Sequence, residues 1–384
     1  MSIIYLDHTA TKAVEPEVLS HYHHMLKTCY ANPASIHGLG LEAEKELEKA
    51  RLTLKQAIGQ TSGQLVFTSG GSESVNLAVK GYIRQNKRLP KRIITTAGEH
   101  AAVYETVRCF EQQGFAVEWL PLCRDGTVNL DAMEKALASP AALLSLIHVS
   151  NESGAVNPVA DVMKLKRRLQ PDLAVHLDAV QSFGKTPFNF DQLGIDMASG
   201  SGHKLGAPKG IGWLSIRPKL RLEPLILGGG QQSGLRSGTE NPPLAFALAM
   251  AADYSISHLH QFAEQAKSLR HFLLSKLNQL KVQPIHIAEA AAVPQILVLS
   301  FSGIRAETMV HALESKGIYV SSGSACSSKI KRRGNRVLQA MGLSQQISDT
   351  AIRISLSGRE TEAEMEHTAK AIEACCRTLI RESF

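Results

Sequence analysis

The sequence is poor in cysteine: it has six in 384 residues, and none belongs to a Cys-x-x-Cys pair suited to zinc. This low density excludes a disulfide scaffold and favours a reducing compartment. Apolar runs such as Ala141 to Ile147 are far shorter than the roughly 20 residues of a membrane-spanning helix. The first residues lack a basic start followed by a long apolar stretch, so we expect no signal peptide and predict a cytoplasmic protein.

A strong charge of one sign is also lacking, since 42 Lys and Arg stand against 35 Asp and Glu, for a formal net charge of +7. The basic residues are scattered, and their densest runs are Arg84 to Arg92, Lys164 to Arg168 and Lys329 to Arg336. Such short runs are typical of solvated faces and loops. We therefore expect no direct DNA binding and no association with a membrane.

The chain is long enough for two or three lobes, and its 44% of hydrophobic residues is ordinary for a globular protein. From about residue 60 to 255, short apolar runs alternate with helix-length amphipathic segments, which predicts an α/β fold with a mostly parallel sheet flanked by helices. The expected strands are 65–68, 92–96, 117–120, 143–149, 174–177 and 212–216. The expected helices of this part include 101–113, 131–138 and 159–169, and an amphipathic helix over 42–58 precedes it.

The last third of the chain has a different pattern. A long helical segment over 244–280 leads to expected strands at 296–301 and 352–355 and helices at 306–316 and 361–380, which indicate a smaller α+β domain. We predict a large domain over residues 16–255 and a small domain formed by 1–15 and 256–384.

Three short segments carry groups for chemistry. The first, 67–76, is a strand end followed by glycines and hydroxyl residues such as Ser72, a pattern that suits a phosphate at a helix N-terminus. The second places Asp178 at the end of a buried strand, where a carboxylate is costly unless it has a partner. The third places Lys204 among small residues just before a strand. Each segment alone has an ordinary explanation, but together they supply what a pyridoxal phosphate site requires.

Motifs along nearly the whole chain lead to a family. They are YLDHTAT at Tyr5, NPASIHGLG at Asn32, FTSGGSES at Phe67, GEHAAV at Gly98, HVSNESG at His148, HLDAVQSFGK at His176, SGHKLGAPKGIG at Ser201, GGGQQSGLRSGTEN at Gly228, SSGSACSS at Ser321 and AIRISL at Ala351. In this series the chain resembles a cysteine desulfurase of the class V aminotransferase family, within the fold type I pyridoxal phosphate enzymes.

The resemblance implies a role for each matching residue. Lys204 would carry the cofactor as a Schiff base, Asp178 would pair with the pyridinium nitrogen, and His100 would stack on the ring and carry protons. Arg353 and Asn32 would bind the substrate carboxylate, a task that suits the planar arginine fork.

The remaining cofactor contacts implied by the resemblance come from small and polar side chains. The phosphate would be held by Gly71, Ser72, Ser201, His203 and, from the partner subunit of a homodimer, Thr239. The ring hydroxyl would be contacted by Asn151 and Gln181. An ordinary structural role remains an alternative for Asn151, Gln181 and His203.

Cys326 distinguishes this family from its relatives. It lies in a Ser- and Gly-rich segment that matches the persulfide loop of the family, followed by Lys329, Lys331, Arg332 and Arg333, whose charges would favour the thiolate. The resemblance implies that L-cysteine is converted to L-alanine while Cys326 keeps a persulfide for a sulfur acceptor. The expected acceptors are an iron-sulfur cluster scaffold or a tRNA-thiolation enzyme.

Two positions depart from the family pattern. Lys12 stands where a second threonine is usual, and the stretch from Lys329 to Arg336 is more basic than usual. We hypothesise that this stretch engages an acidic acceptor or a tRNA-modifying partner by electrostatic steering. Two alternatives stay open at this point: another class V enzyme, such as an aminotransferase or a selenocysteine lyase, and a non-catalytic sulfur carrier that uses only Cys326 and the basic stretch.

Overall fold

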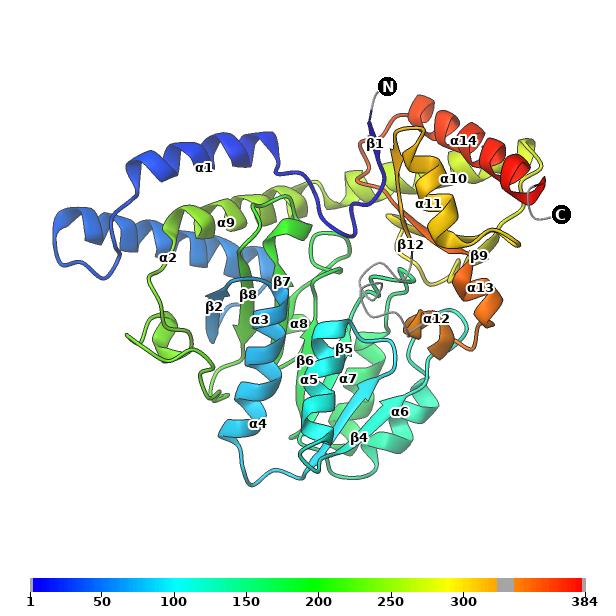
Figure 1. Ribbon diagram of the computed structural model, residues 1–384. Helices are drawn as coiled ribbons and strands as arrows, with labels where there is room; N and C mark the ends of the chain where they lie inside the picture. The colour runs from blue at the N-terminus through cyan, green and yellow to red at the C-terminus, as the bar shows by residue number, and fades with distance from the viewer. Residues whose placement is uncertain (1–2, 323–334, 382–384) are drawn as a thin grey trace.

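The computed structural model describes residues 3–322 and 335–381, and within them the largest unit is a seven-stranded sheet (Figure 1). Its strands, in spatial order, are β2 (Gln64–Thr68), β8 (Gly212–Ile216), β7 (Met197–Ser201), β6 (Ala174–Asp178), β5 (Leu143–Ile147), β3 (Arg92–Thr96) and β4 (Ala116–Leu120). The strands from β7 to β4 are parallel, whereas β8 runs antiparallel to both β2 and β7. The predicted α/β class with a mostly parallel sheet is confirmed.

Strand β7 was not expected from the sequence, because its residues Met-Ala-Ser-Gly-Ser lack the bulky apolar character of a buried strand. The structure shows why small residues stand there. A Cβ atom added to Gly200 would lie 2.1 Å from the indole of Trp213 on β8, so the neighbouring strand supplies the bulk. The two strands are packed as one unit in which only glycine fits beside the tryptophan.

Helices cover both faces of this sheet, as the alternation of side chains along each strand requires. One face packs on α3 (Gly71–Asn76), a π-helical turn (Leu77–Gly81), α4 (Tyr82–Gln85) and α5 (Ala101–Glu111). On the other face lie α2 (Gly38–Ile58), α6 (Leu130–Leu137), α7 (Val159–Leu169), α8 (Phe190–Leu193) and α9 (Pro242–Ser257), and α1 (Pro16–Thr28) packs on α9. Burial on both faces explains the continuous apolar run of the central strand β5, whose sequence is Leu-Leu-Ser-Leu-Ile.

In the described part of the last third of the chain, β12 (Ser321–Ser322), β13 (Ala351–Ser355), β10 (Ile296–Ser300) and β9 (Ile285–Ile287) form a four-stranded antiparallel sheet. The helices around it are α10 (Leu259–Gln279), α11 (Ala306–Glu314), α12 (Arg336–Ala340), α13 (Gln345–Asp349) and α14 (Glu362–Arg381). The N-terminal strand β1 (Ile4–Tyr5) pairs with β11 (Ile318–Tyr319), and Ile4 and Leu6 join the core of this smaller unit. Domain limits at residues 15 and 255 stay a prediction.

The helical segment expected over 244–280 is two helices, α9 and α10, with a break at His258. His258 has φ −104° and ψ 8°, outside the helical region, and its ring stacks on Tyr254 with 4.3 Å between ring centroids. Apolar periodicity continues across the break, which is why the sequence pattern missed it. Within residues 3–322 and 335–381, no helix combines the length and the apolar character that crossing a membrane needs.

Candidate functional site

A cavity of about 190 Å³ lies where several parallel strands end, between the large sheet and β13. In folds of this kind, ligands bind outside the carboxyl ends of the strands. The cavity is lined by Thr9, Ala10, Gly71, Ser72, Val75, His100, Ala102, Ile147, Asn151, Asp178, Val180, Gln181, Ser201, His203, Lys204 and Arg353. Apart from Cys326, Asn32 and Thr239, every site residue predicted from the sequence lies in this wall.

The amine and the carboxylate at the centre of the prediction come from neighbouring strands. Asp178 ends β6 and is buried, with Oδ1 accepting from the Val180 N–H at 3.0 Å. Burial raises the pKa of Asp178, while His100, the Val180 N–H and Lys204 oppose the rise. Lys204 follows β7 in a 3₁₀ turn, and its Nζ donates to the carbonyls of Thr9 at 2.7 Å and Ala10 at 2.6 Å. The site thus holds an amine and a buried carboxylate within one cavity wall.

One end of the cavity is rich in small groups and hydrogen-bond donors. Gly71 and Ser72 begin α3, Ser201 ends β7, and His203 lies in the 3₁₀ turn after β7. A Cβ atom on Gly71 would lie 2.9 Å from Val180 Cγ2, so a larger residue would displace the opposite wall. Burial lowers the pKa of His203 to about 4, helped by the charge of Lys204, so its ring is neutral at pH 7. This end presents backbone and hydroxyl donors to an anion.

His100 caps α5 and faces the cavity. Its Nδ1 accepts from the Ala102 N–H at 3.2 Å, so the proton of a neutral ring belongs on Nε2. Burial lowers the pKa of His100, and the positive charges of Lys204 and Arg336 act in the same direction against Asp178. Next to it, burial raises the pKa of Glu99 to about 8. Burial thus favours the neutral form of both the Glu99 carboxyl and the His100 ring, which are adjacent in the turn before α5.

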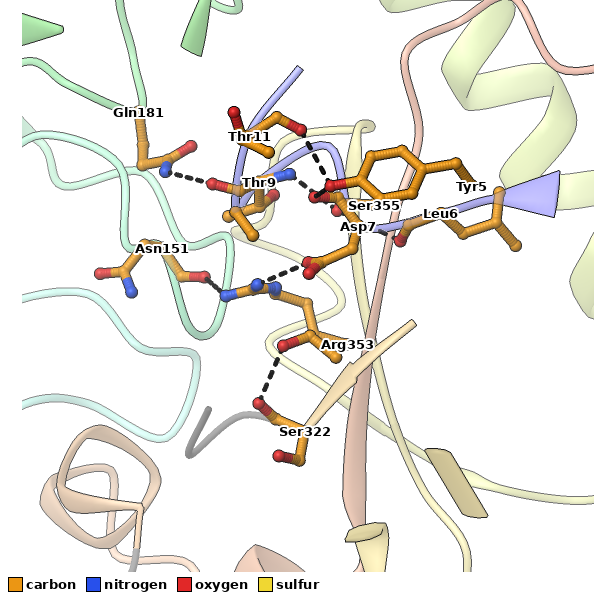
Figure 2. Close-up of polar contacts among 12 residues, drawn as sticks. Tyr5, Leu6, Asp7, Thr9, Thr11, Asn151, Gln181, Ser322, Arg353 and Ser355 are labelled. Atoms are coloured by element: carbon orange, nitrogen blue, oxygen red, sulfur yellow. Dashed lines mark hydrogen bonds and ion pairs between the residues drawn. The ribbon is translucent and has the colours of Figure 1, made fainter. Parts of the chain in front are cut away.

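Arg353 reaches the cavity from β13 and connects it to the N-terminal segment (Figure 2). Its Nη1 donates to the Asn151 carbonyl at 2.7 Å and its Nη2 to Asp7 Oδ1 at 2.9 Å. The Nε atom is buried and has no hydrogen-bond partner among the described residues. Three of the five guanidinium N–H groups are therefore left by these two bonds for a ligand in the cavity.

Three predicted residues lie elsewhere. Asn32 is exposed in the connection between α1 and α2, and its Oδ1 accepts from the Ala34 N–H at 3.0 Å. Thr239 is exposed in the segment before α9 and does not line the cavity of its own chain, which leaves its predicted role in a partner subunit untested. Cys326 lies outside the described residues, as do Lys329, Lys331, Arg332 and Arg333. The roles of all three site residues stay predictions.

The basic stretch expected to meet a partner is described only at its end. Arg336 donates to the carbonyls of Ala97 and Glu99, and its guanidinium lies 4.0 Å from the ring centroid of Tyr104. Arg336 is therefore committed to contacts inside the molecule, against the turn that carries His100, because these two carbonyls and one ring occupy its fork and its face. The steering hypothesis now rests on residues outside the described part.

Sequence reasoning missed the contribution of the N-terminal segment. The YLDHTAT motif was noted, yet no member was assigned to the site. Thr9 and Ala10 line the cavity, the Thr9 N–H donates to Ser355 Oγ at 2.9 Å, and the Thr9 carbonyl accepts from Gln181 Nε2 at 3.0 Å (Figure 2). Only the tertiary contacts show that this segment joins β13 to the large sheet.

Comparison with known proteins places this geometry in a family. The model of class V aminotransferases matches residues 4–367. The chain belongs to the class V aminotransferase family. Within the family, it is 34% identical over 372 residues to the cysteine desulfurase IscS of Dictyoglomus turgidum, a match that covers 96% of this chain and 93% of the relative. It is 36% identical to the mitochondrial cysteine desulfurase of Candida albicans, covering 96% and 76%.

A solved structure agrees with both relatives. The fold superposes on a NifS-like protein with a TM-score of 0.91 and 36% sequence identity, covering 97% of this chain and 99% of the other. The resemblance derived from the motifs, to cysteine desulfurases among the class V aminotransferases, is confirmed.

Proposed function

We propose that this chain is a pyridoxal phosphate-dependent cysteine desulfurase, which converts L-cysteine to L-alanine and leaves a persulfide on Cys326. The observation that carries the proposal is the meeting of Lys204, Asp178, His100 and Arg353 in one cavity. Relatives at 34% and 36% identity over most of the chain bear the name cysteine desulfurase. Neither an aminotransferase nor a carrier without catalysis is favoured by an observation at this site.

The residues of the cavity fit the cofactor. The donors at Gly71, Ser72 and Ser201 suit its phosphate, Asp178 suits a protonated ring nitrogen, and Lys204 is an amine able to hold an aldehyde. Asn151 Oδ1 is buried without a hydrogen-bond partner among the described residues, as expected of a side chain that meets a ligand. When bound, the cofactor would supply a ring that accepts the electron pair left at Cα of the substrate.

The chain's own groups divide the remaining work. The free N–H groups of Arg353 bind the carboxylate of L-cysteine and orient its Cα toward the cavity. Lys204 Nζ takes the Cα proton, and its contacts with two carbonyls place the amine at the end of the N-terminal segment. His100, held neutral by burial, carries protons through Nε2.

Sulfur transfer requires a thiolate. In the proposed step, Cys326 Sγ attacks the substrate sulfur, and an S–S bond forms as the bond between Cβ and sulfur of the substrate breaks. Cβ keeps the electron pair of the broken bond and takes up a proton, which gives alanine. Burial raises the pKa of Cys29 and Cys375, and that of Cys376 to about 11, which disfavours the thiolate at these positions. None of the five described cysteines lines the cavity.

A homodimer is part of the proposal. Tyr30, Ile36 and Leu227 are 74%, 96% and 80% exposed, and they lie in the two segments that carry Asn32 and Thr239. Exposed large apolar side chains are candidates for burial at an interface. A second copy covering them would bring the partner subunit's Thr239 toward the phosphate end. The sulfur acceptor, in iron-sulfur cluster assembly or tRNA thiolation, is proposed from the family alone.

The deciding experiment incubates the purified protein, loaded with pyridoxal phosphate, with L-cysteine. We expect alanine and, by mass spectrometry of peptides, one added sulfur atom on Cys326. The Cys326→Ser variant should keep the absorbance of the bound cofactor and lose persulfide formation, with Cys109→Ser as a matched control that behaves like wild type. Full turnover of L-cysteine by Cys326→Ser would overturn the assignment of the nucleophile.

A further inference from the structure

Lys185 is a buried lysine that the proposed reaction does not use. It lies in a turn between β6 and α8, and only 7% of it is exposed. Its Nζ donates to Gln181 Oε1. Lysine is rarely buried in proteins without a paired group, so this amine in the wall behind the cavity calls for a physical explanation.

Among the residues that the structure describes, no carboxylate forms an ion pair with Lys185. Burial lowers its pKa well below the usual value, and the charged groups that act on it most, Lys12, Lys204 and Arg353, are all positive and act in the same direction. What holds the amine is therefore a hydrogen bond to an amide oxygen, and this bond remains whether or not the amine carries its third proton.

The bond decides which way the Gln181 amide points. On one side of the amide, the Thr9 carbonyl can only accept, and Gln181 Nε2 donates to it at 3.0 Å. On the other side, Lys185 Nζ donates to Oε1. Both neighbours demand the same orientation, so a flipped amide would lose both hydrogen bonds. The nitrogen of Gln181 and its second N–H are thereby kept on the side of Thr9, which also lines the cavity.

We propose that Lys185 is a positioning residue, which fixes the Gln181 amide so that it presents an N–H donor, and never its oxygen, to an oxygen atom of the bound cofactor. This inference rests on the proposed function, because the acceptor is the ring oxygen of pyridoxal phosphate. The ring oxygen carries its negative charge more readily when a donor faces it. An amide oxygen in the same place would repel that charge.

The test measures cofactor binding to apo-protein rather than turnover. Lys185→Met removes the donor at nearly constant length, and we expect the Kd for pyridoxal phosphate to rise by about tenfold, the size of one lost hydrogen bond. The absorption spectrum of the bound cofactor should change as well. Gln181→Leu should give the same two effects, and the double variant should stay within about twofold of Gln181→Leu, since Lys185 acts through Gln181.

Lys166→Met is the matched control. Lys166, on α7, is also a buried lysine and is only 5% exposed. Its Nζ donates to the Pro171 carbonyl at 2.6 Å, and the residue does not line the cavity. We expect Lys166→Met and Lys185→Met both to lower the melting temperature of the apo-protein. Lys166→Met should leave the Kd for pyridoxal phosphate and the absorption spectrum unchanged. Lys185→Leu replaces Lys185→Met if the latter does not fold.

The outcomes separate the two proposals. Two results would overturn the positioning role and leave the proposed function intact. One is a wild-type Kd and spectrum in the folded Lys185 variant. The other is a Lys185→Met change that weakens cofactor binding by the same factor in wild type and in Gln181→Leu. Failure of the wild-type apo-protein to bind pyridoxal phosphate would overturn the proposed function and this inference with it.

Discussion

Arg353 and Asp7 stand 346 positions apart in the chain, yet Arg353 Nη2 donates to Asp7 Oδ1 at 2.9 Å. The side chain of Arg353 is 6% exposed and that of Asp7 20%, so this ion pair is well shielded from solvent. Together with the bond from Nη1 to the Asn151 carbonyl, it fixes two corners of the guanidinium fork. These two bonds (Figure 2) fix the orientation of a guanidinium that lines the cavity.

Arg353→Lys should raise the KM for L-cysteine on the order of 10- to 100-fold, because one ammonium cannot keep both fixed corners and still meet a carboxylate. The effect on kcat should be smaller, since the proton-transfer groups stay in place. Initial rates of alanine formation against L-cysteine concentration give both constants. Arg305→Lys, on the exposed start of α11, should match wild type. An unchanged KM in Arg353→Lys would refute the carboxylate-binding role.

Glu99 should make stability depend on pH in an unusual direction. Burial raises its pKa in the folded protein to about 8 from a reference of 4.5, so the folded state binds the proton more tightly than the unfolded state. The Glu99 contribution is complete below pH 4.5 and is lost as pH rises to about 8. Glu99→Gln, which stays neutral, should therefore gain stability over wild type across this window, by an amount on the order of a few kcal/mol at pH 8.

Denaturant unfolding of wild type and Glu99→Gln at pH 5 and pH 8 measures this difference. Thr96 Oγ1 and the Ile147 N–H both donate to Glu99 Oε1, and the glutamine oxygen accepts them equally. Glu44→Gln, on the exposed face of α2, is the control and should show no such trend. A difference that stays constant between the two pH values would show that Glu99 is not held neutral by the fold.

Arg336→Met should lower the unfolding free energy by about 2–3 kcal/mol, because two carbonyl bonds and the contact with Tyr104 are lost together. It should also lower kcat, since the turn that carries His100 loses its support. Thermal unfolding and steady-state rates measure the two effects. Arg305→Met removes an exposed arginine and should change neither. A variant that is destabilised but has full kcat would separate Arg336 from the His100 turn.

Leu227→Glu should convert a dimer to a monomer, because the carboxylate would be buried unpaired at the interface that we propose. Light scattering after size exclusion measures the oligomeric state. If the partner subunit's Thr239 holds the phosphate, the monomer should also bind pyridoxal phosphate more weakly. Ile285→Glu, on edge strand β9 of the smaller sheet, should stay dimeric. A wild-type protein that is monomeric at all concentrations would contradict the proposed interface.

The sequence predicted the strands with continuous apolar runs and missed those without them. Strands 92–96 and 212–216 were expected at the bounds that the structure has. By contrast, β7 depends on Trp213 of the adjacent strand, and β1 depends on β11, so neither has a local pattern of its own. Isolated pairs of two residues, such as β1, carry too little periodicity for any sequence pattern to detect.

The series of motifs predicted the family, and the resemblance implied most residues of the cavity wall. The residues alone indicated a pyridoxal phosphate site from Ser72, Asp178 and Lys204. Tertiary structure decided the rest. The fold pairs Arg353 with Asp7 and orients the Gln181 amide through its bond to Lys185. It also places Arg336, the last residue of the basic stretch, in contact with the Ala97 carbonyl inside the molecule. These decisions depend on groups that are distant in the chain and become neighbours only when the sheet and the N-terminal segment pack together, which no local pattern records.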